Sequence, residues 1–399
     1  MRVLFSAANC LLDQSSGAAI SIRTLLRQLA AAGVECRSLT GSIYDRPAAG
    51  TNTENLRLSG AAPTDPGEPL GQLWRADDGD VVHLVVPVPR PQRSLQSRQD
   101  EERMLQHTDR VLQDFRPDVL MFYGGGPYER GLVGRARDRG IPVVFYLANP
   151  GYKHAESFRL VDQVFTDTAA TRDLYKERLG LDAYAIGKFI DKPTLPETPE
   201  PARYVTFVNP SAEKGVTLFY RIAELARQIA PQMRFLVVES RATLDDAERR
   251  TGMKFSALGN VRRVGLQRDM GSVFALTRVL LMPSLWHESG PRTPVEACAL
   301  GIPTVATDRG GLPEVLGDAG IFVTPPPPLV ANHWLIPPLS VAIPWVEALR
   351  QLEDDADWYA ERRQLALARW PAHDPRERIG DIVRILQQLV AAKSLAGQR

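Results

Sequence analysis

Short apolar runs alternate with longer stretches of helical periodicity along the first half of the chain. The run at residues 2–7 is followed by an amphipathic stretch at 20–32, which ends before Gly33. Later apolar runs predict strands at 81–86, 119–123, 142–146 and 163–165, and later periodic stretches predict helices at 132–139 and 169–179. A strand, a helix and a second strand in succession give parallel pairing. This order therefore predicts a parallel sheet with helices on both faces.

A proline-rich segment interrupts this alternation, and the pattern then restarts. Residues 192–203 contain four prolines, which favours an interdomain linker. The second series predicts strands at 204–209, 235–239, 279–283, 304–306 and 321–323, and helices at 216–229, 345–352, 358–369 and 376–392. The prolines at 325–328 predict an exposed, polyproline-like loop. Two such series predict two Rossmann-like α/β domains that face a central cleft, with ligands at the carboxyl ends of the strands.

The length and composition support two ordinary globular domains. The chain has 399 residues, of which 44% are hydrophobic and 24% charged, and it is longer than one hydrophobic core usually supports. We therefore expect domains at 1–191 and 204–370, joined by the linker at 192–203, with a helix at 371–399 that crosses back to the first domain. The 48 basic and 47 acidic residues leave a net charge of +1, which gives no signal for nucleic-acid binding.

Cysteine usage and the absence of targeting signals favour a cytoplasmic protein. No apolar stretch reaches the roughly 18 residues that a membrane-spanning helix needs. Residues 2–7 are short for a signal peptide and are interpreted as a first strand. Cys10, Cys36 and Cys298 fit neither a disulfide framework nor a zinc site. The high alanine, arginine and proline content suggests a bacterial source.

The most informative segment is 283–323. A predicted strand ends at its start, a short loop then holds Glu288 and Gly290, and a helix follows with Thr293 as its N-cap. The free backbone N–H groups at this helix start suit a phosphate or a sugar hydroxyl. A second glutamate, Glu296, lies on the same helix, so that two carboxylates come close to the end of one strand.

The ordered motifs of this segment resemble those of retaining GT-B glycosyltransferases of the family-four type, the glycosyl transferases group 1. Glu288 and Glu296 are separated by seven residues as in that family, and the runs 297–305 and 310–314 also match. The resemblance implies a GT-B fold, with the acceptor bound by the first domain and the nucleotide sugar by the second. It also implies that Glu288 contacts the donor sugar and Glu296 the ribose, since a carboxylate can accept hydrogen bonds from two hydroxyls.

Both glutamates have simpler interpretations from the residues alone. Glu296 with Thr293 fits a capping box, in which the glutamate bonds back to the start of its own helix. Glu288 fits a solvated loop carboxylate. The surrounding motif favours the ligand-binding roles over both of these.

The diphosphate side of the donor site needs fixed positive charge and backbone dipoles, because charge grows on the leaving group in the transition state. The resemblance assigns the family's phosphate-binding lysine to Lys214, for which an exposed lysine at a helix start is the alternative. The family arginine five residues earlier is replaced by Asn209, which supplies hydrogen bonds without charge. A second cation is therefore expected from Arg292, Arg262 or Arg263, with an ordinary surface arginine as the alternative for Arg292.

Two glycines are expected next to the donor, and the sequence shows no metal-binding motif for it. Gly17 and Gly290 allow backbone to approach the ligand closely. The acidic clusters at 77–80 and 354–357 are interpreted as solvated, so we expect no metal ion and no cofactor beyond the nucleotide sugar.

The acceptor is expected mainly on the first domain. Candidate contacts follow predicted strands at Tyr128, Asn149, Tyr152 and His154. For the tyrosines the alternative is closing the domain, and for His154 it is a plain surface histidine. Asp167 is interpreted as a helix N-cap. The region 41–106 shows little periodicity apart from one strand, and we expect it to shape the acceptor pocket.

The resemblance thus implies a metal-independent, retaining glycosyltransferase that moves a sugar from a nucleotide sugar, with UDP as the first expectation, to a small-molecule, glycan or lipid-linked acceptor. The alternatives are a non-catalytic nucleotide-sugar-binding partner subunit and a nucleotide-sugar epimerase on the same fold. We expect a monomer or homodimer. Helix 20–32 carries Arg23 and Arg27, which would suit peripheral membrane contact. The interpretation of this helix as packed in the core is favoured over membrane contact.

Overall fold

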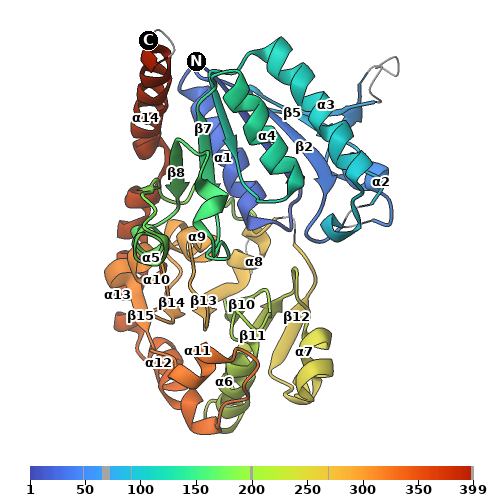
Figure 1. Cartoon of the computed structure of the whole chain (residues 1–399). Helices are drawn as coiled ribbons and strands as arrows, with labels where there is room; N and C mark the ends of the chain where they lie inside the picture. The colour runs from blue at the N-terminus through green and yellow to red at the C-terminus, as the bar shows by residue number, and fades with distance from the viewer. Residues whose placement is uncertain (48, 65–71, 91, 198–200, 268, 397–399) are drawn as a thin grey trace. The chain divides into compact units, whose positions relative to one another are not determined.

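The computed structural model describes residues 1–47, 49–64, 72–90, 92–197, 201–267 and 269–396. The chain divides into two compact units, one made of Met1–Ile190 with Asp374–Arg399 and the other of Asp191–His373 (Figure 1). Part of the predicted linker, residues 198–200, lies outside the described residues.

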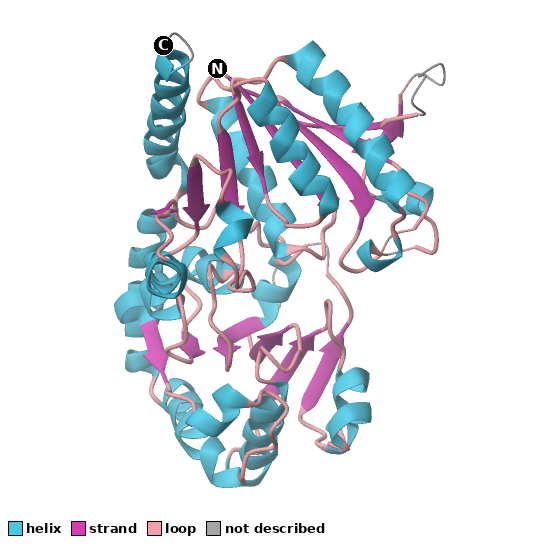
Figure 2. Ribbon diagram, viewed as in Figure 1, coloured by secondary structure: helices cyan, strands magenta, loops and turns pink. Residues whose placement is uncertain are grey.

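In the part of the chain that the structure describes, the first unit is built on one sheet of nine strands in the order β3-β4-β5-β2-β1-β6-β7-β8-β9 (Figure 2). Its strands are β1 (Arg2–Asn9), β2 (Glu35–Ile43), β3 (Ala62–Pro63), β4 (Trp74–Asp78), β5 (Val81–Val86), β6 (Val119–Phe122), β7 (Val143–Leu147), β8 (Gln163–Thr166) and β9 (Tyr184–Ala185). Most neighbours are parallel, as predicted. The expectation of a wholly parallel sheet is wrong at one edge, where β4 pairs antiparallel with both β5 and β3.

Helices cover both faces of this sheet, because successive strand residues point to opposite sides. They are α1 (Gly17–Ala31), α2 (Asn52–Leu58), α3 (Arg98–Phe115), α4 (Pro127–Asp138), α5 (Ala169–Leu179) and α14 (Pro375–Ala396). Leu4 of β1 packs in a cluster with α3 and α4, whereas its neighbours Val3 and Phe5 pack in a cluster with α1 and α14. The region 41–106 showed little periodicity apart from the strand predicted at 81–86, which is β5. It also contains α2, β3, β4 and the first half of α3.

Helix α14 returns to the first unit and contacts α1 there. Ile382 and Leu386 of α14 are buried in the same cluster as Ile22 of α1. Gly187 has a φ of +79°, and a Cβ at this position would overlap the guanidinium of Arg378 on α14. The last residues of the first unit before the linker are therefore held against this helix.

The described residues of the second unit form a parallel sheet of six strands in the order β12-β11-β10-β13-β14-β15. The strands are β10 (Tyr204–Val208), β11 (Arg234–Val238), β12 (Val261–Val264), β13 (Thr277–Met282), β14 (Thr304–Ala306) and β15 (Gly320–Phe322). The helices are α6 (Val216–Ile229), α7 (Leu244–Thr251), α8 (Gly271–Leu276), α9 (Arg292–Leu300), α10 (Leu312–Leu316), α11 (Pro327–Ala331), α12 (Ile343–Asp354) and α13 (Ala356–Arg369). The prediction of two Rossmann-like α/β domains is confirmed.

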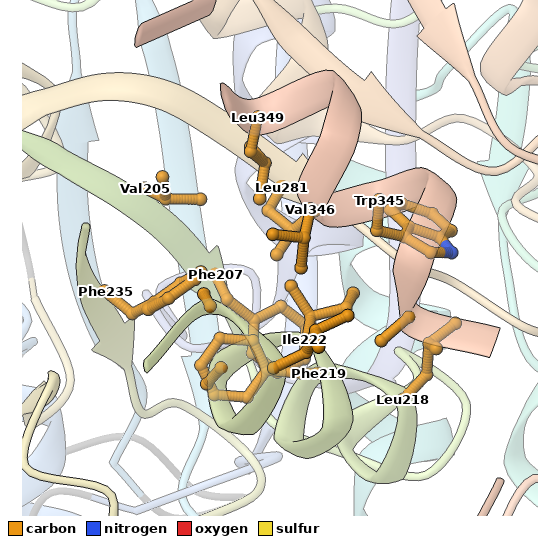
Figure 3. Packing of buried hydrophobic residues seen from close by; sticks show 14 of the residues in the cluster. Val205, Phe207, Leu218, Phe219, Ile222, Phe235, Leu281, Trp345, Val346 and Leu349 are labelled. Atoms are coloured by element: carbon orange, nitrogen blue, oxygen red, sulfur yellow. The ribbon is translucent and has the colours of Figure 1, made fainter. Parts of the chain in front are cut away.

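The core of the second unit fixes where its strands end. Phe207 of β10 stacks on Phe219 of α6 with ring centroids 4.7 Å apart, and Trp345 of α12 is fully buried in the same cluster (Figure 3). On the opposite face, Leu280 and Met282 of β13 pack with helices that include α9. Both faces of β13 are thus buried, which sets the loop that follows this strand at the carboxyl edge of the sheet.

A proline begins a helix in the second unit where the sequence predicted a loop. The predicted polyproline-like loop at 325–328 is wrong in its second half, because α11 begins at Pro327, a first-turn position where the missing N–H of proline costs little. Among the described residues, none of the helices combines the length and apolarity that a membrane span requires.

Candidate functional site

Glu288 lies in the loop after β13 and is almost fully buried, so the interpretation as a solvated carboxylate is wrong. The loop after β14 packs closely against the backbone of Glu288. Gly310 has a φ of +58°, and a Cβ there would lie 2.4 Å from the Glu288 nitrogen. The Gly311 N–H donates to the Glu288 carbonyl over 2.6 Å. Glycine is therefore needed at position 310 for this close approach, and the backbone N–H of residue 311 holds the Glu288 carbonyl.

Lys214 reaches Glu288 from the loop before α6. Its Nζ lies 2.5 Å from Oε1 of Glu288, and the two side chains are 18% and 4% exposed. Gly215 makes this approach possible, because with a φ of +81° it packs so closely on the end of β13 that a Cβ would lie 2.0 Å from the carbonyl oxygen of Pro283. The Leu285 N–H also donates to the Glu213 carbonyl over 2.9 Å. Three loops at the carboxyl edge of one sheet thus meet at Glu288.

The pair sets the charge of Glu288. Burial alone opposes ionisation of the carboxyl group. The Lys214 ammonium, with the nearby polar groups of Ser284 and Trp286, nevertheless holds the pKa of Glu288 below its usual value. The side chain is therefore a fixed carboxylate at neutral pH, able to accept hydrogen bonds from hydroxyl groups.

Glu296 lies in the first turns of α9, and its surroundings contradict the capping box. The N-cap of α9 is Pro291 and not Thr293, whose hydroxyl is directed to the Met282 sulfur at 3.5 Å. Glu296 is only 5% exposed, and its Oε2 is buried without a hydrogen-bond partner among the described residues. Burial raises the pKa of Glu296, an effect that Arg292 only partly offsets. A buried carboxylate oxygen without a donor is costly unless a ligand supplies one.

Of the three candidate cations, only Arg292 is shown beside either glutamate. Its Nε is 3.5 Å from Oε1 of Glu296. Arg262 and Arg263 are exposed on the edge strand β12, where Arg263 pairs with Asp245 at 2.5 Å and Arg262 reaches the Tyr204 hydroxyl at 3.4 Å. Tyr204 lies at the amino end of β10, so Arg262 extends away from the carboxyl edge that carries Glu288.

Asn209 has a structural reason to be asparagine. It follows β10 with a φ of +61°, a left-handed conformation that asparagine tolerates better than most residues. Its Oδ1 accepts the Ala242 N–H over 3.0 Å, so its side-chain amide holds the local turn.

Gly290 lies half-buried in the loop between Glu288 and α9.

The candidate acceptor residues of the first unit have different environments. Tyr128 is fully buried, with its hydroxyl 2.7 Å from Ser6 Oγ and 2.9 Å from Thr108 Oγ1, so stacking on an acceptor is wrong and closing the domain is correct. The Tyr152 hydroxyl accepts the Gly124 N–H over 3.2 Å, and its ring packs edge-on against Phe145.

Two candidates and the first glycine remain accessible. His154 and Asn149 are exposed, and the Asn149 side chain closes a small turn by accepting the Gly151 N–H over 2.9 Å. Gly17 begins α1, and a Cβ there would meet open space. The protein's own packing therefore does not require glycine at position 17.

Asp78 of the first unit corrects one prediction. Asp78 was interpreted as solvated, but it accepts from Arg23 and Arg27 at 2.8 Å each, and these arginines with His83 hold its pKa well below the usual range despite burial. The two arginines of α1 thus bind the β4–β5 hairpin. The apolar face of α1 is buried in the core, which confirms the favoured interpretation of this helix as core-packed.

Asp167 is not a helix N-cap. That position belongs to Thr168, whose hydroxyl accepts the Thr171 N–H. Asp167 is instead buried, where it accepts from Lys188 over 2.8 Å and from the Tyr146 hydroxyl. This buried pair was missed in the sequence because its two members come from different loops.

One residue near Glu288 was also missed. Arg309 precedes the two glycines that hold Glu288, is half-buried, and has no ion pair recorded among the described residues. Its sequence signal was the run 310–314, which drew attention to the glycines and not to the arginine. In the described ranges, no three acidic, histidine or cysteine side chains come together as metal ligands would.

Comparisons with known proteins agree with this fold. Residues 202–335 match the family model of Glycosyl transferases group 1. A search of curated proteins gave no match. Sucrose-phosphate synthase from Thermosynechococcus elongatus superposes with a TM-score of 0.68 at 15% identity, covering 98% of this chain and 100% of that one. A glycosyltransferase from Rickettsia africae ESF-5 superposes with a TM-score of 0.66 at 12% identity, covering 98% of this chain and 98% of that one.

A third structure contains ligands. Anabaena HepE in complex with UDP and glucose has a TM-score of 0.67 at 16% identity, covering 97% of this chain and 99% of that one. These likenesses establish the fold, and the family match lies within the second unit. The chain has the GT-B fold, and its residues 202–335 are similar to glycosyl transferases group 1.

Proposed function

We propose that the protein transfers a sugar from a nucleoside-diphosphate sugar to an acceptor hydroxyl, with retention of configuration at the anomeric carbon and without a metal ion. The observation that carries the proposal is the environment of Glu296. A buried carboxylate oxygen without a hydrogen-bond partner fits a ligand diol, and the nucleotide ribose is such a diol. The HepE complex with UDP and glucose supports UDP as the first donor nucleotide to test.

In this proposal Glu288 orients the donor sugar and Lys214 meets the charge of the diphosphate. The bond between the anomeric carbon and the β-phosphate oxygen breaks while the acceptor oxygen bonds to the same face of that carbon. The acceptor proton passes to the departing phosphate oxygen, so no separate enzymic base is needed. Lys214 and the backbone N–H groups at the start of α9 stabilise the developing charge. The acceptor is held by the first unit, where exposed His154 and Asn149 are the candidates.

Calorimetric titration of the full chain with UDP, GDP, ADP and TDP in the presence of a chelator tests the donor site. We expect one nucleotide to bind clearly, and Glu296→Ala to weaken it at least about tenfold. Glu347→Ala is the matched control, because Glu347 is an exposed glutamate on α12. Binding of none of the four nucleotides, or equal binding by wild type and Glu296→Ala, contradicts the assignment.

Turnover separates a transferase from a non-catalytic binding partner. The wild type is expected to release nucleotide from its donor sugar, and Glu288→Gln is expected to lose most of this turnover while it still binds the free nucleoside diphosphate. NMR of the product gives the anomeric configuration and tests retention. Nucleotide binding by the wild type without turnover on any donor would favour the partner subunit.

A further inference from the structure

The charges around the two glutamates balance before any ligand binds. Glu288 is paired with Lys214 at 2.5 Å and Glu296 with Arg292 at 3.5 Å. Two carboxylates and two cations sum to no net charge. A nucleoside diphosphate carries about two or more negative charges at neutral pH, and backbone N–H groups contribute only partial positive charge. A further cation is needed to offset the diphosphate.

Arg309 lies in a loop that is fastened to this site on both sides. Before it, the Thr307 hydroxyl donates to the Ser284 carbonyl over 2.7 Å. After it, the Gly311 N–H donates to the Glu288 carbonyl over 2.6 Å. The backbone of Arg309 is therefore held next to Glu288 by contacts that do not involve its own side chain.

The Arg309 side chain is half-buried and lacks a recorded partner. Its Nε is buried without a hydrogen bond, and no carboxylate pairs with it among the residues that the structure describes. The neighbouring carboxylate, Asp308, accepts from the Thr324 hydroxyl over 2.6 Å and forms no ion pair with Arg309 among the described residues. A partly buried guanidinium without an acceptor is unfavourable unless a ligand supplies one.

We propose that Arg309 binds the β-phosphate of the donor and supplies the positive charge that the paired cations do not. The inference rests on the proposed function. The β-phosphate is favoured over the α-phosphate because the 309–311 loop contacts Glu288, the residue assigned to the sugar, and the sugar is bonded to the β-phosphate. Arginine suits this task, since its planar donors match two phosphate oxygens at once.

Titration of the full chain with UDP and with UMP tests the assignment, or with the di- and monophosphate of the base that the nucleotide panel selects. Arg309→Gln is expected to weaken the diphosphate at least about tenfold and the monophosphate less than about twofold. Arg309→Lys, which keeps the charge but loses the paired donors, should fall between. Arg263→Gln is the matched control, because Arg263 is an exposed arginine paired with Asp245.

The outcomes separate this inference from the proposed function. If Arg309→Gln preserves the wild-type preference for the diphosphate, or weakens both nucleotides equally, the inference is wrong while donor binding stands. If the wild type binds neither nucleotide of any base, the proposed function fails and the inference fails with it. Thermal unfolding of each variant shows whether it is folded, and Arg309→Lys decides the question should Arg309→Gln not fold.

Discussion

Replacing Lys214 by methionine removes the cation of a buried ion pair while keeping most of the side-chain volume. Breaking such a pair from one side costs about 3–5 kcal/mol when both groups are fully buried. Glu288 is 4% exposed but Lys214 is 18% exposed, and the polar groups of Ser284 and Trp286 remain beside the carboxylate. We therefore expect Lys214→Met to lower the free energy of unfolding by about 2–3 kcal/mol at pH 7.

The stability difference between Lys214→Met and the wild type should depend on pH. In the wild type the folded-state pKa of Glu288 is lowered, so its contribution to stability is present at neutral pH and is lost as the pH falls through that pKa. Without Lys214, burial dominates and raises the pKa of Glu288 above its ordinary value. The penalty in Lys214→Met is then relieved as the pH falls through the raised pKa, so the gap between variant and wild type should narrow from pH 7 toward pH 4.

Urea unfolding followed by tryptophan fluorescence measures the effect, because Trp286 lies beside the pair. Lys254→Met is the matched control, since Lys254 is exposed and has no ion pair recorded in the described part of the chain. Adding Glu288→Gln to Lys214→Met should restore at least about half of the lost stability. A loss below about 0.5 kcal/mol, or a gap that stays constant between pH 7 and pH 4, would refute the reasoning.

Three further predictions test the site and its supports. Glu296→Gln removes a buried carboxyl group whose pKa is raised by burial, so the melting temperature of the variant at pH 7 should equal the wild-type value or exceed it by up to about 4 °C, and the two should converge as the pH falls through that raised pKa; a clear loss of stability would count against a carboxylate oxygen without a donor. Gly215→Ala should cost at least about 3 kcal/mol because its Cβ would lie 2.0 Å from a carbonyl oxygen. Gly252→Ala, which has the same left-handed conformation but open space, should cost about 1 kcal/mol in thermal unfolding; equal losses would show that the contact is unimportant. Tyr128→Phe loses two buried hydroxyl contacts and should cost about 1–2 kcal/mol with donor turnover unchanged; reduced turnover at full stability would return Tyr128 to the acceptor site.

Some elements could be predicted because their signals are local. Helix α5 has the predicted bounds, with a threonine N-cap at its start and Gly180 at a φ of +63° after its end. Helix α6 and strand β5 also match the predicted bounds. In each of these segments the residues that start, stop and bury the element lie next to one another in the chain.

Other elements were missed because their signals are distant. Strand β2 carries polar residues that are buried, and a strand without an apolar pattern gives little periodicity to detect. Ser38 of β2 bonds to His83 at 2.7 Å, and the Ser42 hydroxyl accepts the Val88 N–H over 2.9 Å. These partners lie on or just after β5, and only the folded sheet brings them within reach.

The candidate site shows the same division. The sequence by itself determined the α/β class of both units, the glycosyltransferase motif and the candidate carboxylates Glu288 and Glu296. Only the tertiary structure decided that Lys214, separated by 74 positions, is the partner of Glu288, and that Glu296 keeps an oxygen without a donor. Apolar periodicity and turn residues act over a few neighbours, whereas the charge and hydration of a buried group depend on side chains that only folding brings together.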